Sequence, residues 1–288
     1  KDVETLRPAA LLIAAVLPRE EVRDVLIGAA SIHALPQGAR VGTSAPRRAA
    51  QMLHARPDVT VVGIRGNVAT RLGKLEAGEA DVTLLAAAGL QRLGEAGIGQ
   101  PLDANAWLPA PAQGAIGIEC LAARTDLCGW LGAIDDAPTH HAIRAERALL
   151  LALGGTCHSP IAVLTSHATG QDAGALTLRA AIFSPDGTER TEASASFAPG
   201  DATGPARLAR SLLERSGMAT RGVPAAVLLD ALISLDQGNH ASAAEQLESL
   251  AARQPGTRRV RALLARALLL DRREAEVIAR FAAEAGEA

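Results

Sequence analysis

Short apolar runs alternate with helix-forming segments through the first third of the chain. The apolar runs are rich in β-branched residues, whereas the segments between them show helical spacing and are bounded by Gly, Pro, Asn and Asp. This alternation is typical of βαβ units, so we predict an α/β lobe over residues 23–108, with a mainly parallel sheet and helices on both faces. The predicted strands are 39–43, 59–64 and 82–85, and the predicted helices are 47–55 and 68–75.

Two apolar segments flank this lobe. Residues 9–17 form an apolar run with proline at each end, and residues 108–120 form a loop that leads into a second run. Both runs suit buried strands better than helices. We predict that residues 1–22 and 109–133 are remnants of another α/β domain with an incomplete sheet. Two such lobes predict a periplasmic-binding-like architecture in which the first lobe is incomplete.

A different pattern follows at residues 137–217. A helix-spaced segment at 139–153 precedes three strand-like runs, and the turn Ser184-Pro185-Asp186-Gly187 between two of them is a strong hairpin signal. A further helix is predicted at 207–215. Helices combined with antiparallel strands predict a small α+β domain. The three predicted strands are 161–164, 176–183 and 192–197.

Residues 224–288 are rich in Ala and Leu at helical spacing, and positions 34 residues apart resemble one another. The pattern resembles tetratricopeptide repeats, in which each unit is a pair of helices. Two copies are fewer than the roughly three that such an array usually needs, so we expect this part to pack on itself, on another part of the chain or on a partner protein. The matched pairs are Ala231 with Ala265, Leu235 with Leu269, Ala243 with Val277 and Leu247 with Phe281.

The overall charge argues against a general binder of polyanions. The 288 residues include 29 Lys and Arg against 31 Asp and Glu, and only 2% are aromatic, so we expect no nucleic-acid partner. No apolar run is long enough to span a membrane, no signal peptide opens the sequence, and three irregularly spaced cysteines give neither a disulfide framework nor a zinc pattern. We therefore expect a cytoplasmic protein with no metal site and no membrane partner.

Positive charge is concentrated in one segment. Residues 40–75 contain seven Lys and Arg against one acid, Asp58. Four arginines lie at predicted helix N-termini, where each cation opposes the helix dipole at a cost of roughly 0.3–1 kcal/mol. Guanidinium groups match carboxylate and phosphate geometry, so a bound anion explains the group better than solvated surface charges, the usual alternative. Ser44 is the predicted N-cap of the first of these helices. The four arginines are Arg47, Arg48, Arg65 and Arg71.

One cysteine lies in a loop of small residues. Cys157 follows Gly154-Gly155-Thr156 and precedes Pro160, between a predicted helix and a predicted strand. A backbone that must turn is a poor place for a buried side chain, so we interpret Cys157 as an attachment point or a nucleophile. A small hydrophobic side chain under the loop is an equally good alternative from this segment alone. We expect Cys120, at a strand end, to be structural, and we assign no role to Cys128.

Five motifs stand in one order along the chain: Val41-Gly42-Thr43-Ser44 with Arg47-Arg48; Ile64-Arg65-Gly66-Asn67-Val68 with Thr70-Arg71; Leu85-Ala86-Ala87-Ala88-Gly89-Leu90 with Arg92-Leu93-Gly94; Pro109 with Gln113-Gly114-Ala115 and Gly117-Ile118-Glu119; and Ala145-Glu146-Arg147 ahead of the Gly-Cys loop. Together they resemble the hydroxymethylbilane synthase, or porphobilinogen deaminase, family. The resemblance covers about residues 1–217.

The resemblance implies a transferase of tetrapyrrole and haem biosynthesis. Members join four porphobilinogen units head to tail into the linear tetrapyrrole hydroxymethylbilane and release ammonia at each step. The resemblance also implies a dipyrromethane cofactor, bound covalently through a thioether to Cys157. The expected partners are porphobilinogen and the growing polypyrrole chain, whose acetate and propionate groups require cations.

Individual roles are also implied by the resemblance. Asp2 matches the family's catalytic carboxylate, and a carboxylate beside a pyrrole N–H can stabilise the positive charge that develops when ammonia is lost. The cofactor-binding residues that the resemblance implies, besides Cys157, are Lys1, Thr43, Ser44, Arg47, Arg48, Arg65 and Arg71.

The chain also departs from the family pattern. The family's first domain begins well before the Lys1-Asp2-Val3 motif, Glu4 stands where Pro is usual, and helical repeats such as those at 224–288 are not part of the enzyme. An alternative is therefore a catalytically inactive chain that acts as a scaffold and binds a partner protein through the repeats. From the fold alone, a reversible receptor for a small acid is a further alternative.

Overall fold

The computed structural model describes residues 3, 5, 10–167, 174–201, 203–216, 240–253, 258–273 and 275–277. The chain forms two compact units. The first contains residues 1–151 and 155–200, and the second contains residues 152–154 and 201–288. The domain boundaries expected from the sequence stay predictions.

The first unit contains a five-stranded sheet. Its strands are β2 (Asp24–Ile27), β3 (Arg40–Gly42), β4 (Thr60–Val62), β5 (Val82–Ala86) and β6 (Gln100–Pro101). They lie in the order β4-β3-β5-β2-β6, in which β3 is parallel to β4 and β5, whereas β2 is antiparallel to β5 and β6. The three predicted strands are thus parallel to one another, as expected, but β2 makes the sheet mixed rather than mainly parallel. Strand β2 was not predicted, because its four residues are all buried and show no alternation.

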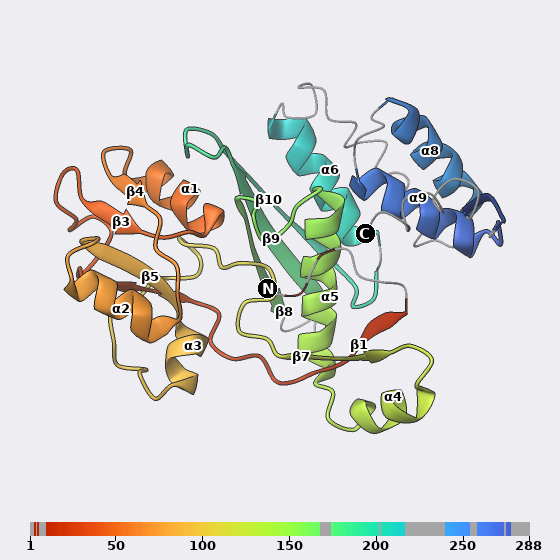
Figure 1. The fold of residues 1–288 in the computed structure, drawn as a ribbon, viewed down its shortest axis with the longest axis horizontal. Coiled ribbons are helices and arrows are strands. Elements are labelled where there is room, and N and C mark those ends of the chain that lie inside the picture. The colour runs from red at the N-terminus through yellow and green to blue at the C-terminus, as the bar shows by residue number, and fades with distance from the viewer. Residues whose placement is uncertain are drawn as a thin grey trace. The chain divides into compact units, whose positions relative to one another are not determined.

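Helices cover both faces of this sheet, as predicted (Figure 1). They are α1 (Pro46–Ala55), α2 (Val68–Glu76) and α3 (Ala87–Arg92). On one face, Met52 of α1 joins a buried cluster with Leu26 and Leu84. On the other face, α2 and α3 pack over Val25 and Leu85. Neighbouring residues of a strand point to opposite faces, which is why Val25 and Leu26 belong to different clusters.

The two longer of these helices begin in different ways. In α1, Pro46 occupies the first turn and Ala45 stands at the N-cap position without a side-chain hydrogen bond. The prediction of Ser44 as N-cap is wrong, because its hydroxyl donates instead to the carbonyl of Ile64 at 3.0 Å. In α2, the side chain of Asn67 accepts a hydrogen bond from the Thr70 amide at 2.8 Å and caps the helix.

The two flanking apolar runs pair with each other. They form β1 (Leu11–Val16) and β7 (Gly117–Leu121), an antiparallel two-stranded sheet, and β7 is followed by α4 (Thr125–Gly132), which was not predicted. The expectation that β7 is buried is wrong. Cys120 lies against α4, whereas alternate residues such as Glu119 and Leu121 point the other way and are exposed.

The remaining part of the first unit is an antiparallel sheet with a long helix, as predicted. Strands β8 (Ile161–His167), β9 (Leu176–Phe183) and β10 (Arg190–Phe197) lie in the order β10-β9-β8. Helix α5 (Ala137–Ala152) is joined to β8 by a hydrogen bond from Thr165 to Glu146. The turn between β9 and β10 contains Gly187, where the hairpin was expected.

The second unit is helical in its described part. It contains α6 (Gly204–Ser216), α8 (His240–Arg253) and α9 (Arg258–Leu270), and α8 packs against α9. The buried hydrophobic residues of α8 and α9 are Ala243, Ala244, Leu247, Leu263, Leu264, Ala267 and Leu268. Ala231, Leu235 and Phe281 of the predicted repeat lie outside the described residues. None of the described helices has the length and the apolar character that crossing a membrane requires.

Gly187 provides a test of how the β9–β10 hairpin packs on α1. Its φ is +73°, and a Cβ at this position would lie 2.6 Å from the His54 amide nitrogen and 2.7 Å from the Ala50 carbonyl oxygen. We expect Gly187→Ala to lower the free energy of unfolding by about 1–3 kcal/mol in urea denaturation.

Gly200→Ala is the matched control for Gly187→Ala. Its φ is +86°, but no heavy atom of the described residues lies within 4 Å of the added Cβ, so the variant carries the backbone strain without the collision. We expect a smaller loss. Equal losses in the two variants would contradict close packing of the hairpin on α1.

Candidate active site

The buried carboxylate of Asp24, at the start of β2, accepts five hydrogen bonds. Both oxygens of Asp24 accept from arginines of α1: Arg47 at 2.7 Å, and Arg48 at 2.7 and 3.2 Å. The Trp107 indole donates at 2.9 Å and the Gln113 amide at 3.0 Å. Asp24 is fully buried, and both arginines are also buried. The anion that pairs with Arg47 and Arg48 is therefore the side chain of Asp24, and not a bound ligand as the sequence suggested.

The charges of this cluster do not cancel. Burial alone would raise the pKa of Asp24, but the charges of Arg47 and Arg48 and their hydrogen bonds outweigh it and hold the pKa well below its ordinary value. Burial also lowers the pKa of Arg47. Two guanidinium groups against one carboxylate leave one net positive charge. Further donors bind main-chain oxygens, from Arg47 to Leu108 and from Arg48 to Leu84.

Gln113 connects Asp24 to a second buried carboxylate. Its side chain binds Asp24, and its carbonyl accepts from Arg19 at 2.9 Å. Arg19 forms a two-pronged ion pair with Glu146 of α5, at 2.6 and 3.0 Å. Glu146 also accepts from the Ala112 amide at 2.6 Å. The loop at 112–114 is thus fixed at both sides by buried carboxylates.

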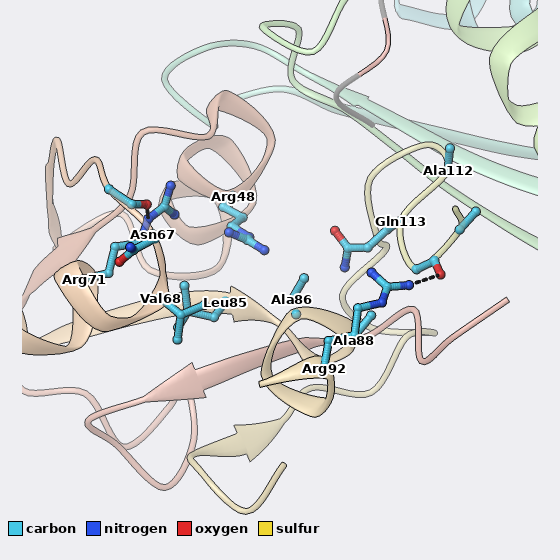
Figure 2. Close-up of a pocket in the computed structure, with 14 residues that line it drawn as sticks. Arg48, Asn67, Val68, Arg71, Leu85, Ala86, Ala88, Arg92, Ala112 and Gln113 are labelled. Carbon is cyan, nitrogen blue, oxygen red and sulfur yellow. Dashed lines mark hydrogen bonds between the residues drawn. The ribbon is translucent and has the colours of Figure 1, made fainter. Parts of the chain in front are cut away.

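A pocket of about 310 Å³ opens beside this loop. Figure 2 shows that three helices each direct one arginine toward it: Arg48 from α1, Arg71 from α2 and Arg92 from α3. The 14 described residues that line it include no Asp or Glu. A concave site to which the described chain contributes three cations and no acid suits an anionic ligand, and guanidinium groups suit carboxylates in particular.

Arg71 and Arg92 are held by main-chain carbonyls. Arg71 donates from Nε to Gly66 at 2.8 Å, and Arg92 donates from Nη2 to Gly114 at 3.3 Å. Burial lowers the pKa of Arg71, and the nearby charge of Arg48 adds to this effect. An anion in the pocket would offset that mutual repulsion.

The other predicted site residues are placed less closely around the pocket. Arg65 is exposed and does not line it. Thr43 is buried and accepts from the Ala45 amide at 3.2 Å, and Ser44 binds Ile64 as described above. Lys1 and Asp2 lie outside the described residues. The roles of these residues stay predictions.

Cys157 is exposed on the short loop between α5 and β8. The loop is held by its own residues: the Thr156 amide donates to the Ser159 hydroxyl at 3.0 Å, and the Gly155 amide donates to the Leu150 carbonyl at 2.8 Å. A Cβ on Gly155 would lie 2.4 Å from Ile161 Cδ1, so the loop begins in close contact with the domain core. The thiol is not a buried hydrophobic group, which removes that alternative.

Comparison with known proteins identifies the family. A model described as "Porphobilinogen deaminase, dipyromethane cofactor binding domain" matches residues 1–128, and one described as "Porphobilinogen deaminase, C-terminal domain" matches residues 140–215. A curated porphobilinogen deaminase of Nitrobacter hamburgensis is 45% identical over 221 residues, which are 75% of this chain and 69% of the relative. The chain belongs to the porphobilinogen deaminase family.

The match to porphobilinogen deaminases covers part of each protein. The deaminase of Sphingopyxis alaskensis is 56% identical over 194 residues, which are 66% of this chain and 61% of that relative. The deaminase of Xanthomonas euvesicatoria is 48% identical over 165 residues, which are 56% of this chain and 54% of that relative. Residues after 215 lie outside both family models.

The predicted set missed three residues of the pocket and its buried cluster. Arg92 lines the pocket, Asp24 pairs with Arg47 and Arg48, and Gln113 both lines the pocket and binds Asp24. Arg92 and Gln113 stand in motifs that signalled the family. Among the described residues, no group of three or more His, Cys, Asp or Glu could hold a metal ion.

Removing the Asp24 charge tests the role of the buried cluster. In Asp24→Asn the two buried arginines lose their anion, so we expect the free energy of unfolding to fall by about 3–5 kcal/mol. Chemical denaturation measures it. Asp126→Asn, which breaks an exposed pair with Arg124, is the control and should cost much less. A loss in Asp24→Asn no larger than in the control would contradict the role of Asp24.

Proposed function

We propose that this protein carries out porphobilinogen deaminase chemistry, the stepwise joining of four porphobilinogen units into hydroxymethylbilane with release of ammonia. The observation that carries the proposal is the pocket whose described lining contains Arg48, Arg71 and Arg92 and no Asp or Glu, in the same compact unit as the exposed Cys157. Porphobilinogen bears an acetate and a propionate, so both substrate and product are polycarboxylates. Their charge matches this pocket.

The arginines divide into two roles in this proposal. Arg71 and Arg92, whose hydrogen bonds within the described part of the chain go to the main-chain carbonyls of Gly66 and Gly114, receive substrate carboxylates. Arg48 contributes charge from the pocket wall, while Arg47, whose donors go to Asp24 and Leu108, holds Asp24 and the loop at 107–113 in place. Arg65, Thr43, Ser44 and Lys1 complete the proposed binding set.

The residues present fit a covalent dipyrromethane. Cys157 offers an exposed thiol on a loop, and the pocket arginines match the carboxylates of a dipyrromethane. When bound, this group supplies the anchored primer to which each new unit is added. Asp2 is the proposed catalytic carboxylate, which stabilises positive charge at a pyrrole nitrogen. We place the chemistry in the cytoplasm and assign the lobes of residues 1–133 a periplasmic-binding-like architecture.

A second candidate function involves the residues outside the family match. Helices α8 and α9 pack against each other, and Leu269 and Leu270 at the end of α9 are each 45% exposed. Such a helical pair, built like a tetratricopeptide unit, would bind a partner protein through its apolar positions. In this candidate the rest of the chain is a scaffold and Cys157 has no modification.

The intact mass of the purified chain tests the deaminase proposal. After incubation with porphobilinogen or hydroxymethylbilane, we expect added mass equal to two pyrrole units, retained under denaturing conditions. The adduct should be absent in Cys157→Ser and present in Cys128→Ser, the control for loss of a thiol. An unmodified mass would overturn the proposal for this chain. Reversible binding without an adduct would favour a receptor for small acids instead.

A further inference from the structure

Two cysteines that the deaminase site does not use lie side by side. The sulfur atoms of Cys120 on β7 and Cys128 on α4 are 3.5 Å apart, and each side chain is half-buried. They come from different elements joined by a short turn, in which the amide of Arg124 binds the carbonyl of Leu121 and the amide of Cys128 binds the carbonyl of Arg124. The pair is therefore held together by the local fold.

We propose that Cys120 and Cys128 form an oxidisable dithiol, a modification site that takes a small-molecule disulfide such as oxidised glutathione and closes to a disulfide between β7 and α4. The sulfur atoms need to approach by only about 1.5 Å to reach the length of an S–S bond, near 2.05 Å. The inference does not depend on the proposed function, because neither thiol lines the arginine pocket.

The exchange balances with glutathione as the oxidant. The thiolate of one cysteine attacks oxidised glutathione, forms a mixed disulfide and releases one glutathione thiolate. The second cysteine then attacks the cysteine sulfur of this mixed disulfide and releases a second glutathione thiolate. In sum, two protein thiols are oxidised and one glutathione disulfide is reduced to two thiols. Burial raises the pKa of Cys120, and the hydrogen bond with Cys128 adds to this.

Partial exposure serves both steps of this exchange. Either half-buried thiol can meet a small disulfide, and the adjacent thiol then displaces glutathione before a second molecule reacts. Cys157 gives an internal comparison, because it is exposed and lies on a different loop. A single exposed thiol is expected to stop at the mixed disulfide.

Closure would tie α4 to the two-stranded sheet. Strand β7 pairs with β1 from Leu11 to Val16, so the bridge would join α4 covalently to the strand pair. The expected consequence is slower amide hydrogen exchange in α4 in the oxidised protein than in the reduced protein.

Tryptic peptide mapping of the full chain tests the proposal. Trypsin separates the three cysteines, because they lie in the segments 93–124, 125–144 and 148–179. After treatment with oxidised glutathione, we expect the first two peptides to be joined with a loss of about 2 Da from their summed masses, while any free Cys157 carries glutathione. Reduction should restore the separate peptides.

Cys128→Ser is the matched control for the bridge. In this variant Cys120 should carry glutathione or remain reduced, and no joined peptide should form. Glutathione on both Cys120 and Cys128 of the wild-type chain, or bridges from either to Cys157, would overturn the proposal. The wild-type map decides the question even where the variant fails to fold.

Discussion

The buried carboxylate of Asp24 is the constraint on which the site depends. Two arginines in the first turn of α1 would oppose both the helix dipole and each other in a low-dielectric interior, and Asp24 makes their burial possible. Because one carboxylate faces two guanidinium groups, the cluster keeps a positive charge at the wall of the pocket. That charge, together with Arg71 and Arg92, makes the pocket positively charged, as the proposed carboxylate ligand requires.

The same network connects parts of the chain that are far apart in sequence. Asp24 binds Gln113, Gln113 binds Arg19 through its carbonyl, and Arg19 pairs with Glu146, so α1 of the mixed sheet is linked to α5. Both ends of this series of contacts are buried carboxylates with several partners each, and removing either carboxylate leaves a buried or half-buried arginine without its anion. The pocket loop at 112–114 lies in its middle, which explains how a loop without regular structure is fixed.

Local pattern predicted most of the regular elements but not the network. Strand β9 and helix α2 follow directly from alternation and helical spacing, and the glycine turn at Gly187 from turn chemistry. Strand β2 was missed because it is short and wholly buried, and with it the antiparallel half of the sheet. Asp24 meets Trp107 and Gln113 across 83 and 89 residues of sequence, a contact that no local pattern reveals. Arg47 and Arg48, which were expected to bind a ligand, therefore share Asp24 as a partner inside the protein.

Calorimetric titration with porphobilinogen tests most directly whether the arginine pocket binds the substrate's carboxylates. The wild-type chain is compared with Arg71→Gln, which removes a pocket cation, and with Arg144→Gln, which removes an exposed cation of α5 that does not line the pocket. We predict that Arg71→Gln weakens binding roughly tenfold or more, the value of a charge-assisted hydrogen bond, and that Arg144→Gln leaves it unchanged. Equal affinity in all three proteins would contradict the account.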